Sequence, residues 1–184
     1  MVIISHKHKF IYIKTYKTAS TSIQIYLGKF CGDQDVLTPI EPVTSEIGRL
    51  YNETVKNFKG FYSHIGAKEI QKLVGYDIWN HYFKFTFERN PWDRAVSFYH
   101  FYKKTKDLSV SFEEWIQDWI KSKKRVSNYD LYTIKGKVAV DYIGKYENLE
   151  LDLRYVLDKL KLPFEDLPKE KSGYRRNNME YRSF

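Results

Sequence analysis

The first thirty residues change from a strand pattern to a helix pattern across a short polar stretch. Residues 9–14, KFIYIK, are aromatic and β-branched, which is typical of a β-strand. The polar residues 15–22, TYKTASTS, follow. Apolar side chains then recur at helical spacing up to about Gly32, namely Ile23, Tyr26, Leu27 and Phe30. The pattern predicts a strand, a loop and a helix in this order.

A second strand followed by a helix is predicted in the middle of the chain. Residues 82–87, YFKFTF, mostly alternate aromatic with polar side chains and predict a strand. Asn90 and Pro91 suit the cap and the first position of a helix, and Asp93 suits its first turn because a negative charge favours the helix dipole.

The other elements follow the same alternation. Ala67 to Val74 predict a short helix that ends at Gly75. Ser111 and Glu114 form a capping box before another helix. Residues 138–143 predict a third strand, and Asn148 opens a helix that ends before Pro163.

Strands that alternate with helices predict an α/β domain in which helices flank a central parallel sheet. Nothing in the sequence reads as a linker or a repeat, so we expect a single domain over residues 1–184, with a core of about 9–160. Residues 168–184 are expected to form a basic C-terminal tail without periodicity.

The composition excludes several classes of protein. Aromatic residues number 32 of 184 (16 Tyr, 12 Phe and 4 Trp), which argues against a disordered chain. The single cysteine, Cys31, excludes an intramolecular disulfide framework and a cysteine-based zinc site. Mean hydropathy is −0.58, and we see neither a membrane-spanning run nor a signal peptide. We therefore expect a soluble, cytoplasmic protein.

The charge is strongly basic, with 31 Lys and Arg against 23 Asp and Glu, a net charge of +8. An excess of this sign favours an anionic partner. Nucleic acid, an acidic glycan, a phosphorylated nucleotide or a charged membrane surface would each satisfy it, and so would solvated lysines that only keep the protein soluble.

The loop between the first strand and the first helix has the chemistry of a phosphate site. The N-terminus of a helix offers unpaired N–H groups and a partial positive charge. The side chains that would add donors at this point are Lys17, Thr18, Ser20, Thr21 and Ser22. The loop contains no glycine, so it is not a Walker A loop.

A second anion site is predicted where the second strand ends. Arg89 can bind a phosphate through two N–H groups, and Ser97 lies two helical turns after Asn90 on a similar face. Two such sites at the carboxyl ends of two strands suggest one ligand with phosphates at two places. The alternative is that Arg89 pairs with Glu88 or Asp93 and that Ser97 is only a helix-surface residue.

Three segments resemble motifs of one enzyme family. Residues 10–22, FIYIKTYKTASTS, are similar to the 5′-phosphosulfate-binding loop of sulfotransferases, strand–P-K-T-[AG]-x-T-S, and also to the K-T-A-S-T loop of hexuronic 2-O-sulfotransferases. Residues 85–97, FTFERNPWDRAVS, resemble the 3′-phosphate-binding motif R-[ND]-P-x-[DE]-R-x-x-S. Residues 141–152, DYIGKYENLELD, resemble the I-G-R-x-E-N-L segment of carbohydrate-type members, here the bacterial and phage-like ones.

The resemblance implies a P-loop-like sulfotransferase domain that uses 3′-phosphoadenosine 5′-phosphosulfate (PAPS) and releases adenosine 3′,5′-bisphosphate. The acceptor would be a hydroxyl group of a small molecule or glycan, and no metal would be required. Lys17 would contact the oxygen between phosphate and sulfuryl group. The 5′-phosphate would lie against Thr18, Ala19, Ser20, Thr21 and Ser22. The 3′-phosphate would lie against Arg89 and Ser97.

The acceptor hydroxyl needs a general base, and histidine suits neutral pH. Of five histidines, we expect His6, His8 and His81 at the far end of the sheet and His100 well along a helix. His64 lies just before a helix in SHIGAKEI, which resembles the H-x-[SG]-A-x-E-I stretch of bacterial members. We expect His64 to be the base.

Some positions depart from the family pattern. Tyr16 replaces the usual proline, Glu88 could compete with phosphate for Arg89, and Lys145 replaces arginine. In the basic tail, Lys171, Arg175 and Arg176 could close over the nucleotide, or the tail could simply be mobile.

Two other functions stay open at this point. A small-molecule kinase would need the glycine loop and a Mg²⁺ site. A non-catalytic nucleotide- or nucleic-acid-binding module would explain the basic patches at 103–106, 121–125 and 169–182, although the sequence matches no known motif for specific nucleic acid recognition. The acceptor pocket is expected from residues 33–62 and 103–137.

Overall fold

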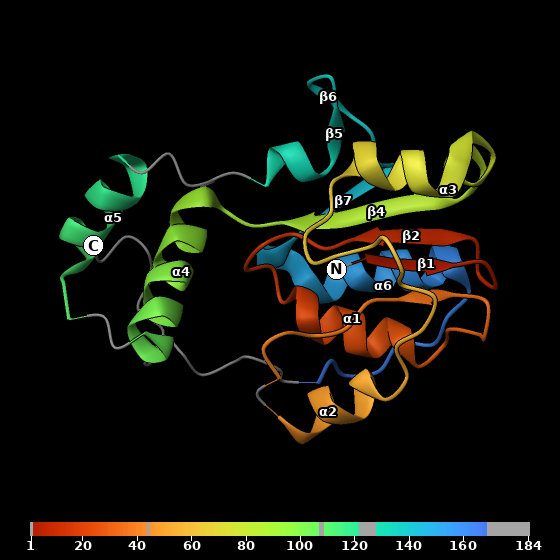
Figure 1. The fold of residues 1–184 in the computed structure, drawn as a ribbon, viewed down its shortest axis with the longest axis horizontal. Coiled ribbons are helices and arrows are strands. Elements are labelled where there is room, and N and C mark those ends of the chain that lie inside the picture. Colours follow the sequence, from red (N-terminus) through yellow and green to blue (C-terminus); the bar gives the residue numbers. More distant parts are fainter. Residues whose placement is uncertain (1, 44, 107–108, 122–127, 169–184) are drawn as a thin grey trace.

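The computed structural model describes residues 2–43, 45–106, 109–121 and 128–168. They form an α/β fold around a five-stranded sheet (Figure 1). The strand order across the sheet is β3 (Val36–Leu37), β1 (Val2–Ser5), β2 (Phe10–Ile13), β4 (Phe83–Glu88) and β7 (Tyr142–Lys145). The α/β prediction is therefore confirmed.

The sheet is mixed, which corrects the prediction of a parallel sheet. β2, β4 and β7 run parallel, but β1 is antiparallel to both β2 and β3. The pattern did not reveal β1 as a strand because all four of its residues are buried, so it has no alternation of polar and apolar positions. Residues 6–9 connect it directly to β2 in a tight turn, which only antiparallel strands allow.

Helices cover both faces of the sheet. They are α1 (Ser20–Gly28), α2 (Glu46–Asn52), α3 (Ala67–His81), α4 (Pro91–Thr105), α5 (Phe112–Lys121) and α6 (Leu149–Leu160). In Figure 1, α3 lies on one side of the sheet, α1 and α6 lie on the other, and α4 and α5 extend beyond the end of β4. Among the described residues, no helix has both the length and the apolarity to span a bilayer.

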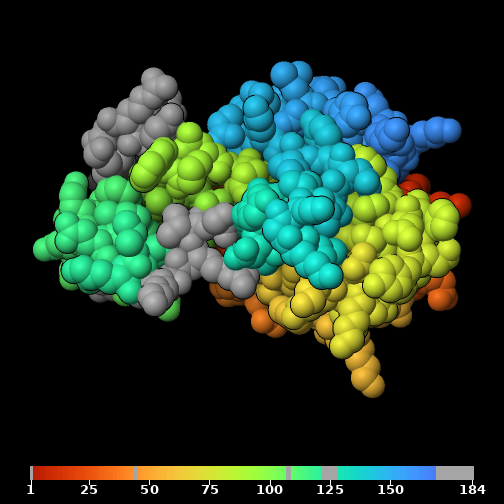
Figure 2. Space-filling view, turned by 90° about the horizontal axis from the view of Figure 1, so that it is seen from above, coloured from red at the N-terminus to blue at the C-terminus, as the bar shows by residue number. Residues whose placement is uncertain are grey.

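The two faces of the sheet bury separate apolar clusters. One face packs Tyr12 and Phe85 against Tyr26 of α1 and Leu157 of α6. The opposite face packs β1 and β2 against α3, for example through Trp79. Seen from the α3 side, Figure 2 shows α3 and residues 130–145 side by side, with α4 and α5 at one end of the molecule.

Two predicted boundaries shift in the structure. The helix expected to end at Gly75 continues to His81, because Gly75 takes φ 82° in a kink and the helix resumes after it. The third strand, expected over 138–143, is divided: β6 (Lys137–Val138) pairs with β5 (Thr133–Ile134) outside the main sheet, and β7 begins only at Tyr142.

Two predicted helix starts are confirmed. The Asn90 side chain accepts hydrogen bonds from the backbone N–H groups of Trp92 and Asp93. Ser111 and Glu114 bind each other's backbone N–H groups, as a capping box requires.

The close approach of β7 to β4 leads to a first prediction. A Cβ atom added at Gly144 would lie 2.4 Å and 2.6 Å from two ring carbons of Phe87. Gly144→Ala should therefore lower the free energy of unfolding by about 1–3 kcal/mol, measured by urea denaturation. At the control position Gly32, a Cβ would lie 3.5 Å from Lys7. Gly32→Ala should therefore change the free energy of unfolding by less than about 0.5 kcal/mol. Equal stability of both variants would contradict this packing.

Candidate functional site

The loop of residues 15–19 leads from the carboxyl end of β2 into α1 and leaves the start of this helix open to an anion. Lys17 and Ala19 both have left-handed backbone conformations, with φ of 60° and 55°. Ala19 is the N-cap, and its methyl group cannot accept a hydrogen bond from the first turn. The N–H groups and the positive end of the helix dipole are thus left for another acceptor.

Hydroxyl groups surround this helix start, and internal hydrogen bonds hold some of them in place. Ser20, Thr21 and Ser22 are buried in the first turn of α1. Thr18 is fully buried, with its Oγ1 3.0 Å from Oγ1 of Thr15, whose hydroxyl in turn donates to the backbone oxygen of Phe87. The Thr18 side chain therefore ties the loop to β4.

Lys14 adds a buried cation beneath the same helix end. Its ammonium donates to Oγ1 of Thr21 at 2.9 Å and to Oε1 of Gln24 at 3.0 Å. Because the Thr21 oxygen is the acceptor here, its own O–H points elsewhere. Lys14 is not among the site residues predicted from the sequence, although its position at the end of a predicted strand was a usable signal.

Arg89 is buried at the end of β4 and connects the two predicted phosphate motifs. Its Nη1 donates to the backbone oxygen of Lys17 at 2.9 Å. Its Nε and Nη2 both lie 2.6 Å from Oδ2 of Asp93. The guanidinium carbon lies 3.9 Å from the ring centroid of Tyr146, a stacking arrangement. The pairing of Arg89 with Asp93, one of the alternatives above, is therefore present.

Glu88 does not compete for the Arg89 side chain. Its carboxylate pairs with the guanidinium of Arg94, and Tyr132 donates to it at 3.3 Å. Burial and the negative charge of Glu88 raise the pKa of Tyr132 to about 12. Burial lowers the pKa of Arg94, and attraction to Glu88 opposes that shift.

Ser97 and the Lys17 ammonium lie on the α4 side of the site. Ser97 is half-buried on α4, two turns after Asn90. The Lys17 ammonium lies 4.3 Å from the ring centroid of Phe101 and 5.8 Å from that of Phe98, both on α4. Since Asn90 caps α4 itself, a phosphate near β4 would depend on side chains rather than on this helix end.

The structure places His64 beside the loop of residues 15–19. Its ring stacks on Tyr16 with centroids 3.6 Å apart and an angle of 17°. Its Nδ1 lies 3.2 Å from the backbone oxygen of Lys14, which can only accept, so Nδ1 carries the proton. In the neutral ring, Nε2 then carries the lone pair and can accept a proton.

Three other histidines lie away from this edge, as expected. His6 and His8 are in the turn before β2, where they contact Tyr82 and the backbone oxygen of Phe30. His81 ends α3 immediately before β4. The tail residues Lys171, Arg175 and Arg176 lie outside the described residues.

Comparison with known proteins identifies the family of this chain. A family model described as "Sulfotransferase family" matches residues 1–183. The chain belongs to the sulfotransferase family. Over 98 residues it is 41% identical to an uncharacterized protein of Archaeoglobus fulgidus. The matched stretch covers 52% of this chain and 82% of that protein. Membership in the sulfotransferase family supports sulfuryl transfer as the general activity.

The pair of Glu88 and Arg94 beside this candidate site gives a second prediction. The two side chains are only 25% and 4% exposed. Arg94→Leu leaves the Glu88 charge without its cation and should lower the free energy of unfolding by about 3 kcal/mol, measured with urea. Adding Glu88→Gln should restore part of this loss.

The control for this prediction is an exposed pair. Arg49 and Glu46 are each 68% exposed, so Arg49→Leu should cost less than about 1 kcal/mol. A loss at Arg94 no larger than the loss at Arg49 would show that the buried pair does not contribute as described.

Proposed function

We propose that this protein transfers a sulfuryl group from PAPS to an acceptor hydroxyl, such as one on a carbohydrate. One observation carries the proposal. The hydrogen bond from Arg89 to the Lys17 backbone places the ends of β2 and β4 against each other. A ligand bound at both ends must carry anionic groups at two places, as PAPS does and a simple phosphate ester does not.

The α1 side suits the 5′-phosphosulfate. Ala19 leaves the first-turn N–H groups available, and Lys14 adds positive charge below Thr21. Thr18, Ala19, Ser20, Thr21 and Ser22 are proposed to surround the 5′-phosphate. The hydroxyl of Thr18 already bonds within the loop, so we expect this residue to contribute through its backbone N–H.

The β4 side suits the 3′-phosphate, with Arg89 and Ser97 as its proposed partners. Three N–H groups of Arg89 already bond to Asp93 and to Lys17, whereas a guanidinium has five. The phosphate would therefore use the remaining donors or displace the carboxylate of Asp93. Lys171 and Arg175 remain predicted contacts from the tail.

Lys17 is proposed to stabilise the leaving oxygen. As the bond from sulfur to this oxygen breaks, negative charge grows on the oxygen, and an ammonium beside it lowers the barrier. In the structure the ammonium rests on Phe101. A contact of this kind at a partly exposed site is worth about 1 kcal/mol, so the side chain can leave it at small cost.

His64 is proposed as the general base. Nε2 takes the proton of the acceptor hydroxyl while the acceptor oxygen forms its bond to sulfur. The bond from sulfur to the 5′-phosphate oxygen breaks on the opposite side, and adenosine 3′,5′-bisphosphate leaves with that electron pair. The products are the sulfated acceptor, the bisphosphate and one proton on His64.

A nucleotide series tests the two-phosphate arrangement. In calorimetry without magnesium, adenosine 3′,5′-bisphosphate should bind about 10- to 100-fold more tightly than adenosine 5′-phosphate or ATP, because charge-assisted bonds to Arg89 and Ser97 contribute about 1.5–3 kcal/mol. Ser97→Ala and Arg89→Ala should reduce this preference. Arg154→Ala, at an exposed position on α6, should retain it. Equal affinities of the wild-type protein for all three nucleotides would contradict the proposal.

Histidine substitution tests the base. His64→Ala should lower turnover of PAPS with the best hydroxyl acceptor from a carbohydrate and phenol panel by about 100-fold or more. Its affinity for adenosine 3′,5′-bisphosphate should stay within about twofold, because the base does not bind the phosphates. His81→Ala, on an exposed side chain before β4, should match the wild type in both measurements. Unchanged turnover in His64→Ala would remove this residue from the mechanism.

A further inference from the structure

Asn128 holds the backbone of Tyr16 from a segment 112 residues further along the chain. Its Oδ1 accepts the Tyr16 N–H at 2.9 Å, and its Nδ2 donates to the Tyr16 carbonyl oxygen at 3.2 Å. The backbone N–H and the backbone carbonyl of Tyr16, in the loop of residues 15–19, are therefore both bound by one side-chain amide. Asn128 is itself only 1% exposed.

The same amide is anchored on the second phosphate motif. Nδ2 of Asn128 also donates to Oε1 of Glu88 at 3.0 Å, and Glu88 is paired with the buried Arg94. The carboxylate fixes the direction of the amide, because it accepts only from the NH₂ group and so turns the oxygen toward the Tyr16 N–H. The loop after β2 and the end of β4 are thus joined through Asn128.

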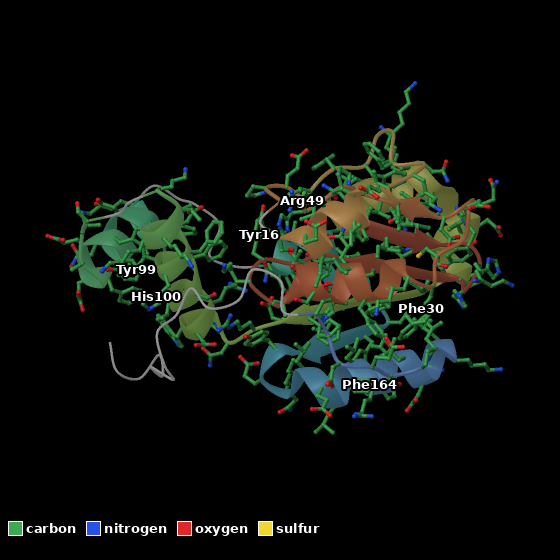
Figure 3. The ribbon with its side chains drawn as sticks, turned by 90° about the horizontal axis from the view of Figure 1, so that it is seen from below. Tyr16, Phe30, Arg49, Tyr99, His100 and Phe164 are labelled. Carbon is green, nitrogen blue, oxygen red and sulfur yellow. The ribbon has the colours of Figure 1, made fainter. Side chains whose placement is uncertain are left out.

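Tyr16 lies between the two residues proposed to perform the chemistry. Its ring stacks on His64, and Lys17, the next residue, holds a left-handed conformation. Figure 3 shows Tyr16 at the end of the sheet that is nearest α4. Its ring also lies 5.9 Å from Phe98, near the Lys17 ammonium. A shift of the Tyr16 peptide groups would therefore move the base and the lysine together.

The residue type at position 16 makes this bond possible. The motif that residues 10–22 resemble has proline here, which fixes φ but has no N–H to donate. Tyr16 lacks that restraint and has an N–H, which Asn128 binds. The amide therefore restrains a loop position that a proline ring would otherwise restrain.

We propose that Asn128 is a positioning residue for sulfuryl transfer, which sets the relative placement of Lys17 and His64 by holding the Tyr16 backbone. This inference rests on the proposed function. Asn128 acts through Tyr16 and Glu88, so its removal should affect turnover more than nucleotide affinity.

The molecule contains a matched control for this contact. Tyr26, on α1, holds a backbone segment in a similar manner: its hydroxyl accepts the Glu165 N–H at 3.1 Å and donates to the Pro163 oxygen. Tyr26→Phe removes this pair of hydrogen bonds from a backbone segment outside both the proposed site and the expected acceptor pocket.

The experiment compares Asn128→Ala, Asn128→Ser and Tyr26→Phe, with thermal unfolding recorded for each. With PAPS and the best acceptor from the hydroxyl panel, both Asn128 variants should lose about 10- to 100-fold in kcat, because small displacements of reacting groups are costly. Their affinity for adenosine 3′,5′-bisphosphate should fall less than threefold. Tyr26→Phe should keep the wild-type kcat even where its thermal stability falls as far. The serine variant serves if the alanine variant does not fold.

Hydrogen exchange separates this inference from the proposed function. Loss of the Asn128 bond should speed exchange of the Tyr16 amide by about tenfold or more, and Tyr26→Phe should leave this amide unchanged. An unchanged Tyr16 amide in both Asn128 variants, or a kcat equal to that of Tyr26→Phe, would overturn the positioning role. A wild-type protein that neither binds the bisphosphate nor uses PAPS would overturn the proposed function, and the role in transfer with it.

Discussion

The parallel pairing of β2 with β4 is the constraint on which the site depends. Phe10 pairs with Phe83 and Tyr12 with Phe85, so the two strands end at the same edge of the sheet. Loops that leave this edge must meet, and the bond from Arg89 to the Lys17 backbone is the point of contact. A ligand that spans both loops needs no further element to bring its binding groups together, because the strand register has already done so.

The charges at this edge divide into buried pairs and groups open to a ligand. Asp93 and Glu88 each neutralise one arginine, which keeps both guanidinium groups stable in a buried setting. The charges at the start of α1 are arranged differently, since the Ala19 side chain does not cap the helix and Lys14 adds a buried ammonium. The proposed 5′ side is thus more strongly electropositive than the proposed 3′ side, where a phosphate would share Arg89 with a carboxylate. The proposed function needs both halves, and the geometry indicates how they differ.

Local sequence patterns predicted those structural features that depend on residues close together in the chain. The cap at Asn90 and the strand–loop–helix around residues 9–30 follow from short-range signals. His64 is selected by elimination among the histidines and by the resemblance of its segment to a family motif. The antiparallel β1 could not be recognised because it is buried on both faces. The hydrogen bonds from Asn128 to the Tyr16 backbone could not be predicted either, since they join residues 112 positions apart. No spacing rule connects an asparagine after a basic segment to a tyrosine in a loop. Side-chain partners across the sheet edge emerge only when the fold is known.

We propose above that one nucleotide bridges the loop after β2 and the end of β4. A crystal structure of the protein with adenosine 3′,5′-bisphosphate would test this directly. We expect the 5′-phosphate on the N–H groups of the first turn of α1 and the 3′-phosphate within hydrogen-bond distance of Arg89 and Ser97. A nucleotide bound with only one phosphate at this edge, or bound at another surface, would contradict it.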